Sequence, residues 1–210
     1  MNPNLFFTPT DILLPAHADM RRWSVIACDQ FTADAGYWQA VQDTVCDAPS
    51  TLRLMLPEFY LGKCDEAAAT REIQQAMRRY LDDGVFRTVP HSLVLVQRTL
   101  PGGTVRCGIV GALDLEAYDY APDSVTPIRA TEGTVASRLP ARVHIRAAAA
   151  LEMPHIMVFY SDPEDTICRE AQAAAGETLY DFDLMSGGGH VRGLRIAGAK
   201  ADALAARLCA

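Results

Sequence analysis

The chain lacks the sequence features of common metal sites, membrane spans and secretion signals. Its six cysteines occur singly, without any Cys-x-x-Cys or His-x-x-x-His pair, so a structural zinc site is not expected. No apolar run approaches the ~18 residues needed to cross a bilayer. A signal peptide requires a basic segment before its apolar run, and the start of this chain has only a short apolar run without such a segment. We therefore expect a protein of the reducing cytoplasm, with free thiols and no membrane partner.

Positive charge is also scarce. The 19 lysines and arginines face 26 aspartates and glutamates, which gives a net charge of −7. Proteins that bind nucleic acids generally need a basic surface, so this balance argues against general nucleic-acid binding. With 210 residues, half of them hydrophobic, the chain is long enough to bury a real core. We expect a single unit over residues 1–210, and any sub-boundary within it near residues 84–92.

The few positive charges gather in one place. Residues 128–146, IRATEGTVASRLPARVHIR, hold four arginines and one glutamate, a local net charge of +3. Guanidinium groups bind phosphate and carboxylate oxygens through paired hydrogen bonds, so this concentration suits a small anionic ligand. The predicted ligand-binding residues of the segment are Arg129, Thr131, Thr134, Arg138, Arg142 and Arg146.

Glu132 lies among these arginines, where it would serve as a general base or a metal ligand if the segment is catalytic. A spacing of four would align Arg138, Arg142 and Arg146 on one face of a helix. Pro140 interrupts a helix there, however, and residues 143–145 alternate as in a strand. The alternative interpretation is a solvated basic strip that pairs with residues 162–183, which hold seven acids and one arginine. Such surface pairs contribute only ~0–1 kcal/mol each.

The hydrophobic pattern mixes helices with strands. Residues 65–83 form the clearest helix, with Asp65 as its cap and Gly84 suited to the left-handed position past its end. A second helix is expected after Thr32, its proposed N-cap, and a third at residues 199–210. Strands are expected at residues 23–28, 92–99, 104–115, 155–160, 178–184 and 191–197, with hairpins at 101–103 and 186–189. We predict an α+β fold with a mixed, largely antiparallel sheet, hairpins and flanking helices.

Three other places in the sequence are candidate sites. Asp29 and Gln30 follow the strand expected at residues 23–28, and the C-terminal ends of strands often face a ligand crevice. The alternative, which we favour, is an aspartate that caps the next turn. The three glycines before His190 would form either an anion-binding nest of amides or a plain hairpin turn. Cys28 has no neighbouring base to activate it, so we expect a small buried side chain.

Several uncommon strings occur along nearly the whole chain. They are residues 7–15, 25–32 (VIACDQFT), 48–61 (APSTLRLMLPEFYL), 129–135 (RATEGTV), 151–158 (LEMPHIMV) and 179–190 (LYDFDLMSGGGH). Together they resemble a bacterial and archaeal family known as domain of unknown function 1015, which is sometimes linked to the ParB, sulfiredoxin and free-serine-kinase superfamily. Members of that family are much longer and carry a Gly-Asp-Gly-Asn-His or Asp-Gly-His-His-Arg type motif in their second half. This sequence has neither motif, so the resemblance identifies it with the N-terminal half.

The resemblance implies the anion- or substrate-binding half of a nucleotide-dependent, phosphotransferase-like enzyme. ATP and Mg²⁺ enter as cofactors only through this implication, and the residues leave open whether the chain alone is an enzyme. A second hypothesis is a non-catalytic binding or regulatory interaction module. A third, ParB-like DNA binding, is opposed by the net charge of −7. An apolar face left by a missing second half would favour a homo-oligomer.

Overall fold

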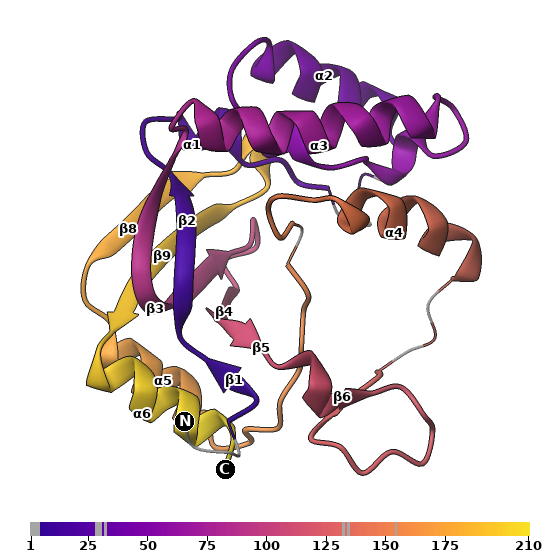
Figure 1. Cartoon of the computed structure of the whole chain (residues 1–210). Coiled ribbons are helices and arrows are strands. Elements are labelled where there is room, and N and C mark those ends of the chain that lie inside the picture. The colour runs from indigo at the N-terminus through magenta and orange to yellow at the C-terminus, as the bar shows by residue number, and fades with distance from the viewer. Residues whose placement is uncertain (1–4, 28–30, 32, 132, 134, 154) are drawn as a thin grey trace.

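The computed structural model describes residues 5–27, 31, 33–131, 133, 135–153 and 155–210. Within these ranges an antiparallel sheet forms the centre of the molecule, with helices gathered at its two ends (Figure 1). The predicted α+β class, with hairpins and flanking helices, is confirmed. None of the helices in the described ranges is long and apolar enough to cross a membrane.

The sheet is organised around one long strand, β3 (Phe86–Thr99). One edge of β3 pairs with β2 (Thr10–Pro15) along its first half and with β4 (Val105–Val110) along its second half. The other edge pairs with β9 (His190–Ala197), and β8 (Thr178–Asp183) pairs with β9 in turn. All of these pairings are antiparallel. Because β2 lies near the N-terminus and β9 near the C-terminus, segments from both ends of the chain meet on β3.

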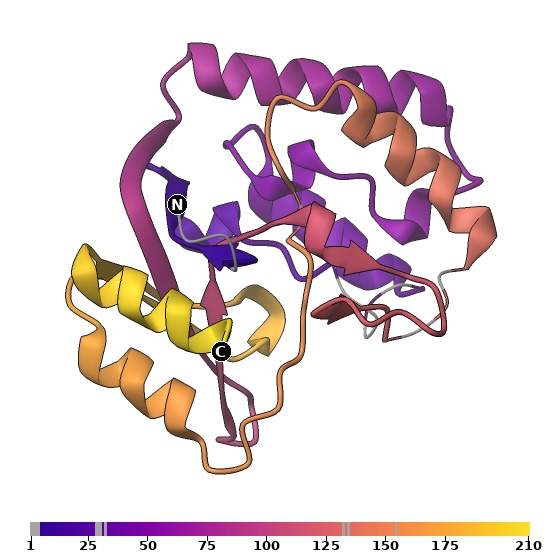
Figure 2. The same cartoon turned by 60° about the horizontal axis from the view of Figure 1, so that its bottom comes forward.

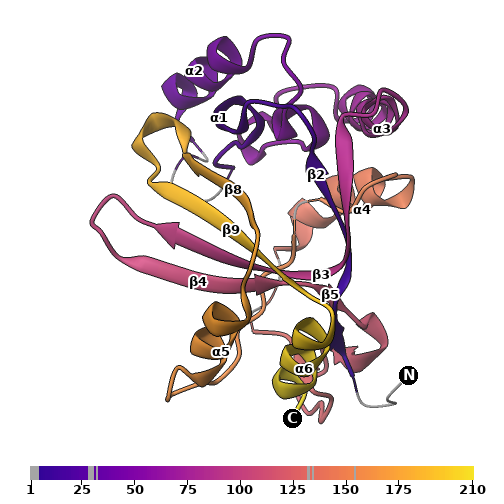
Figure 3. The ribbon, with the colours of Figure 1, turned by 90° about the vertical axis from the view of Figure 1, so that its left-hand side faces the viewer.

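A bend in β3 lets this strand serve two partners on one edge, and Figure 3 shows it turning away from β2 toward β4. The bend lies at Pro90 and His91, where the β2–β3 register shifts. Pro90 has no amide hydrogen for the ladder, and His91 has a φ of +36°. The amide of His91 donates instead to Oδ1 of Asp11 at 2.8 Å, which holds the bulge in place.

Both predicted hairpins are confirmed. Thr99 faces Val105 at the end of the β3–β4 ladder, and the amide of Leu100 donates to the carbonyl of Thr104 across the turn. In the β8–β9 connection, the amide of Leu184 donates to the carbonyl of Gly189 at 2.8 Å. Gly189 has a φ of +94°, and a Cβ at this position would lie 2.1 Å from the carbonyl oxygen of Thr99. Only glycine fits there, because both the backbone angle and the space exclude a side chain.

Two helices cover one face of the sheet. They are α5 (Thr166–Ala174) and α6 (Ala199–Leu208), which lie side by side (Figure 2). The core between them and the sheet consists of Leu93, Leu95, Ile167, Ala171, Leu194, Ile196, Ala201, Leu204 and Ala205. The alternate residues of β3 and β9 supply the sheet side of this core, as the period of two requires. The predicted C-terminal helix is confirmed.

The opposite end of the sheet carries the remaining helices: α1 (Met20–Trp23), α2 (Ala35–Val45), α3 (Glu66–Asp82) and α4 (Leu139–Ala147). The predicted limits of α3 are confirmed, because the Asp65 carboxylate accepts from the amide of Ala68 at 3.0 Å and Gly84 has a φ of +65°. The helix expected after Thr32 is confirmed as α2, but its cap is Asp34, which accepts from the amide of Tyr37 at 2.9 Å. Thr32 lies outside the described residues.

Two predicted strands are wrong. Trp23 ends α1, and its carbonyl accepts hydrogen bonds from the hydroxyls of Ser50 and Thr51 instead of joining a sheet. Residues 24–27 have no regular structure. The second error is residues 155–160, which form no strand and are exposed. Composition predicted an extended backbone in each case, but a strand also needs a neighbour to pair with.

Candidate functional site

The last part of the cationic segment forms the helix α4, which presents both of its arginines on one face. Ala141 and Ile145 are buried, and Ile145 packs in a cluster with residues of α3. Arg142 and Arg146, one turn apart, are exposed. Pro140 lies in the first turn, where a missing amide hydrogen costs nothing. The helical alignment predicted from the spacing of four is therefore correct for these two arginines, and the strand-like interpretation of residues 143–145 is wrong.

Helix α4 is anchored to α3 through its backbone. The side-chain amide of Gln74 donates to the carbonyls of His144, at 2.9 Å, and Ile145, at 3.1 Å. These are carbonyls near the C-terminus of a short helix, where intrahelical donors are missing. The contact fixes α4 against α3, so buried packing and these hydrogen bonds together hold the helix that carries Arg142 and Arg146.

Each of the two arginines forms an ion pair at the surface. Nη2 of Arg142 lies 3.2 Å from Oε1 of Glu58, and the two side chains are 56% and 20% exposed. Arg146 pairs with Glu152, which follows a few residues along the chain. Exposed pairs of this kind contribute ~0–1 kcal/mol. An incoming phosphate or carboxylate would therefore compete with weak partners.

The loop before α4 carries the other predicted residues. Arg129 ends β7 (Ile128–Arg129), which pairs in parallel with β6 (Tyr118–Asp119). Its Nε donates to the carbonyl of Thr126 at 3.2 Å, and both Arg129 and Thr131 are exposed. The backbone of Arg138 lies in a 3-10 turn, Ala136–Arg138, that runs directly into α4.

Four predicted site residues lie outside the described residues: Asp29, Gln30, Glu132 and Thr134. The side chain of Arg138 is not described either. The expected convergence of arginines around Glu132 therefore stays a prediction. The described part of the segment brings Arg142 and Arg146 together on one helix face.

A small cavity of about 390 Å³ lies beside the start of α4. Ser137, Pro140 and Ala141 line one side of it, and the other side includes Glu58 and Glu66. The carboxylate of Glu66 accepts from the amide of Gly62 at 2.9 Å. Two carboxylates in the wall oppose an anion inside this cavity, so an anionic ligand would approach Arg142 and Arg146 from the outer face of α4.

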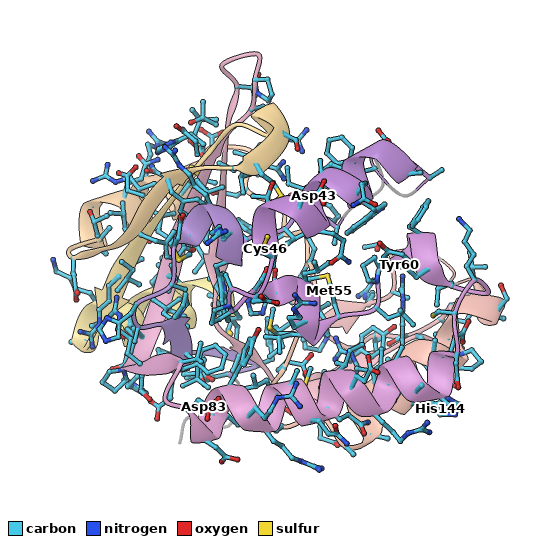
Figure 4. All side chains as sticks on the ribbon, turned by 90° about the horizontal axis from the view of Figure 1, so that it is seen from above. Asp43, Cys46, Met55, Tyr60, Asp83 and His144 are labelled. Atoms are coloured by element: carbon cyan, nitrogen blue, oxygen red, sulfur yellow. The ribbon has the colours of Figure 1, made fainter. Side chains whose placement is uncertain are left out.

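A larger cavity of about 520 Å³ lies between α2 and α3. Figure 4 looks down on it, with Met55 between the two helices and Tyr60 toward one end. Leu52, Ile73 and Ala76 give it an apolar floor, and its charged lining residues are Asp47, Arg53, Glu72 and Arg79. The two signs balance, so this cavity has no preference for an anion.

The sequence interpretation missed this second cavity. Much of its wall comes from residues 52–60, within the string 48–61 that contributes to the family resemblance. That string was the available signal. The hydrophobic spacing of residues 48–61 predicts no helix or strand. The opposite wall of the cavity comes from α3, so the cavity exists only because distant segments pack together.

The three glycines before His190 form a hairpin turn. Gly187 and Gly189 both have positive φ values, and the amide of Gly188 donates back to the carbonyl of Met185. The imidazole of His190 lies between two carboxylates, with Nδ1 2.8 Å from Oδ1 of Asp183 and Nε2 2.6 Å from Oδ1 of Asp181. The hydrogen bond to Asp183 is the main reason that the pKa of His190 is raised. This cluster ties the two strands of the hairpin together.

The chain between α4 and α5 runs extended along the molecule, shown in orange in Figure 1. Five consecutive side chains of this connection are apolar and exposed: Ile156 61%, Met157 79%, Val158 45%, Phe159 74% and Tyr160 45%. Monomeric proteins rarely leave so many neighbouring large apolar groups in water.

The fold and these surfaces define an α+β domain with a cationic helix face and an unpaired apolar segment. The chain belongs to the family described as protein of unknown function (DUF1015), whose model matches residues 9–208. The predicted family is confirmed. No curated protein and no solved structure matches the chain.

Proposed function

We propose that this chain binds a small anionic ligand through the outer face of α4, with Arg142 and Arg146 as the principal cations. The observation that carries the proposal is their placement one turn apart on a helix that is anchored by Gln74. Two guanidinium groups on one face form a two-point contact for phosphate or carboxylate oxygens.

The charge of the segment supports the same function. Residues 128–146 have a net charge of +3 in a protein whose net charge is −7, so the local potential favours anions at this place. The carboxylates of Glu58 and Glu152 are the present partners of the two arginines. Arg129, Thr131, Thr134 and Arg138, with Asp29 and Gln30, remain the proposed additional contacts, and Glu132 the proposed base.

The reaction class that we propose is phosphoryl transfer, in which the arginines would neutralise charge on phosphoryl oxygens. ATP and Mg²⁺ belong to this proposal because of the suggested relation to phosphotransferases. A cytoplasmic location, predicted from the scattered single cysteines, is part of it as well.

Thermal unfolding with inorganic phosphate, ATP and ADP, each with and without Mg²⁺, tests the binding. A ligand at about a hundred times its Kd adds ~2.7 kcal/mol, which raises Tm by roughly 5–11 °C for a domain of this size. The double variant R142Q/R146Q should lose most of this shift. R71Q/R78Q, which removes two exposed arginines from α3, should keep it.

Two results would contradict the proposal. One is an equal shift in the wild type and in R142Q/R146Q. The other is the absence of a shift with any of the phosphate compounds. A shift that disappears in R79Q but not in R142Q/R146Q would move the site to the cavity between α2 and α3.

The second candidate function is a protein-interaction module. The specific observation that favours it is the exposed apolar run from Ile156 to Tyr160. Burying such a run against another protein would gain roughly 25 cal/mol for each Å² removed from water. Binding of a hydrophobic dye that is lost in the variant F159S tests whether this surface is accessible in solution.

A further inference from the structure

The connection between α4 and α5 has the backbone of a strand without a strand beside it. Residues 155–161 run extended in both views of Figures 1 and 2. In the described part of the chain, no backbone hydrogen bond involves these seven residues. Their amides and carbonyls are therefore open on both edges, and such edges readily accept another strand.

The side chains of this segment are apolar on both of its faces. Ile156, Val158 and Tyr160 alternate with Met157 and Phe159, and all five are exposed. Side chains of this size at these exposures leave roughly 600 Å² of apolar surface in water, which is the upper end for the largest patch on a monomer.

We propose that residues 155–161 pair in antiparallel fashion with the same residues of a second copy, across a two-fold axis at Val158. This inference rests on the second candidate function and names its partner. In this register Met157 faces Phe159 and Ile156 faces Tyr160. Each is an aliphatic side chain opposite an aromatic one, a combination that stabilises cross-strand pairs. A two-fold interface requires a surface of this self-complementary kind.

The charges on either side of the segment favour the antiparallel direction. Residues 142–154, on its N-terminal side, carry Arg142, Arg146 and Glu152, a net charge of +1, and residues 162–165, on its C-terminal side, carry three acids, a net charge of −3. Antiparallel pairing brings the N-terminal flank of one copy toward the C-terminal flank of the other. Flanks of opposite net charge therefore meet at both ends of the pair, whereas a parallel arrangement would bring the two acidic flanks together.

The test is the molecular mass in solution, measured by light scattering or sedimentation over a wide range of concentration. The wild type should have twice the chain mass of 22.9 kDa. V158K places two lysines opposite each other at the axis, and V158D places two aspartates there, so each variant alone should be monomeric. An equimolar mixture of V158K and V158D should regain the dimer. V125K, which changes a valine that is 90% exposed elsewhere, should remain dimeric.

A monomeric wild type, a dimeric V158K, or a mixture that stays monomeric would overturn the inference. Dye binding separates this failure from that of the interaction module. A monomeric wild type that binds a hydrophobic dye, with binding lost in V158K, would keep the interaction surface and exclude the second copy as its partner. Circular dichroism and Tm of each variant confirm that the fold is retained.

Discussion

Arg142 and Glu58 join the outer face of α4 to the wall of the small cavity beside it. Their charged atoms lie 3.2 Å apart, and Glu58 is the more buried partner, with 20% of its side chain exposed. Glu58 comes from a short 3-10 turn, Glu58–Tyr60, that is far from α4 in the sequence. A ligand anion on α4 must compete with this carboxylate for the guanidinium group.

The variant E58Q should therefore bind phosphate more tightly than the wild type. The exposed pair contributes ~0–1 kcal/mol, so the expected gain in affinity reaches about fivefold, measured by isothermal titration calorimetry. The matched control is E66Q, which removes the same charge from the same cavity without a contact to Arg142. Equal gains in phosphate affinity in both variants would mean that the overall negative charge of the cavity, and not the contact between Glu58 and Arg142, weakens binding.

The close approach of Tyr180 to Gly193 predicts a stability effect. A Cβ at Gly193 would lie 2.1 Å from Cζ of Tyr180, its cross-strand partner. Burial of this ring raises the pKa of Tyr180 to about 12. G193A should lower the free energy of unfolding by about 1–3 kcal/mol, because the ring must move. G108A is the control, since a Cβ there meets no atom within 4 Å.

Denaturant unfolding of both variants checks this prediction. Gly108 and Gly193 lie on opposite sides of Val96 in the sheet, so both changes are made in the same region of the sheet. The double variant Y180A/G193A should show less than the sum of the two single losses. A G193A protein as stable as G108A would mean that Tyr180 moves away at no cost.

The His190 cluster predicts a stability that depends on pH. Hydrogen bonding to Asp183 raises the pKa of His190 above its ordinary 6.5. The stabilisation is complete below pH 6.5 and is lost as the pH rises through the raised pKa. The hydrogen bond to His190 in turn lowers the pKa of Asp183 below 3.8. The stabilisation that comes from ionised Asp183 is therefore lost only as the pH falls through this lowered pKa.

Tm measured across this range should therefore decrease above pH 6.5 in the wild type. H190Q should flatten the decrease, because glutamine has no proton to lose. H17Q, a change at an exposed histidine, should leave it intact. An identical pH profile for wild type and H190Q would show that the cluster contributes nothing to stability.

The two ends of α3 predict opposite effects for two aspartates. Asp65 caps the start of the helix, so D65A should lower the free energy of unfolding by about 0.5–2 kcal/mol. Asp83 lies at the other end, where a negative charge opposes the helix dipole, so D83A should be neutral or slightly stabilising. Chemical denaturation of the two variants gives the comparison, and a stabilised D65A would contradict it.

Local signals account for the parts of the fold that the sequence predicts well. Asp65 and Gly84 mark both ends of α3, and the glycines of the two hairpins fix their turns within a few residues. The strand expected at residues 23–28 fails because the carbonyl of Trp23 finds its partners in Ser50 and Thr51. That choice depends on residues about 27 positions away, which periodicity does not reveal.

The candidate site divides in the same way. The spacing of four predicts that Arg142 and Arg146 share a helix face, and local geometry confirms it. Pro140 does not interrupt the helix, because proline is acceptable in a first turn. The pairing of Arg142 with Glu58 depends on packing between distant segments, so no local pattern contains it.

The position of β9 has a consequence for synthesis on the ribosome. Ser92 on β3 pairs with Ala197 on β9, so roughly 100 residues must be translated before that edge is covered. At a translation rate of about 5–20 residues per second, the edge of β3 that pairs with β9 stays unpaired for roughly 5–20 s during synthesis. During this interval the emerging polypeptide is open to wrong partners, and we expect it to depend on chaperones more than the finished protein does.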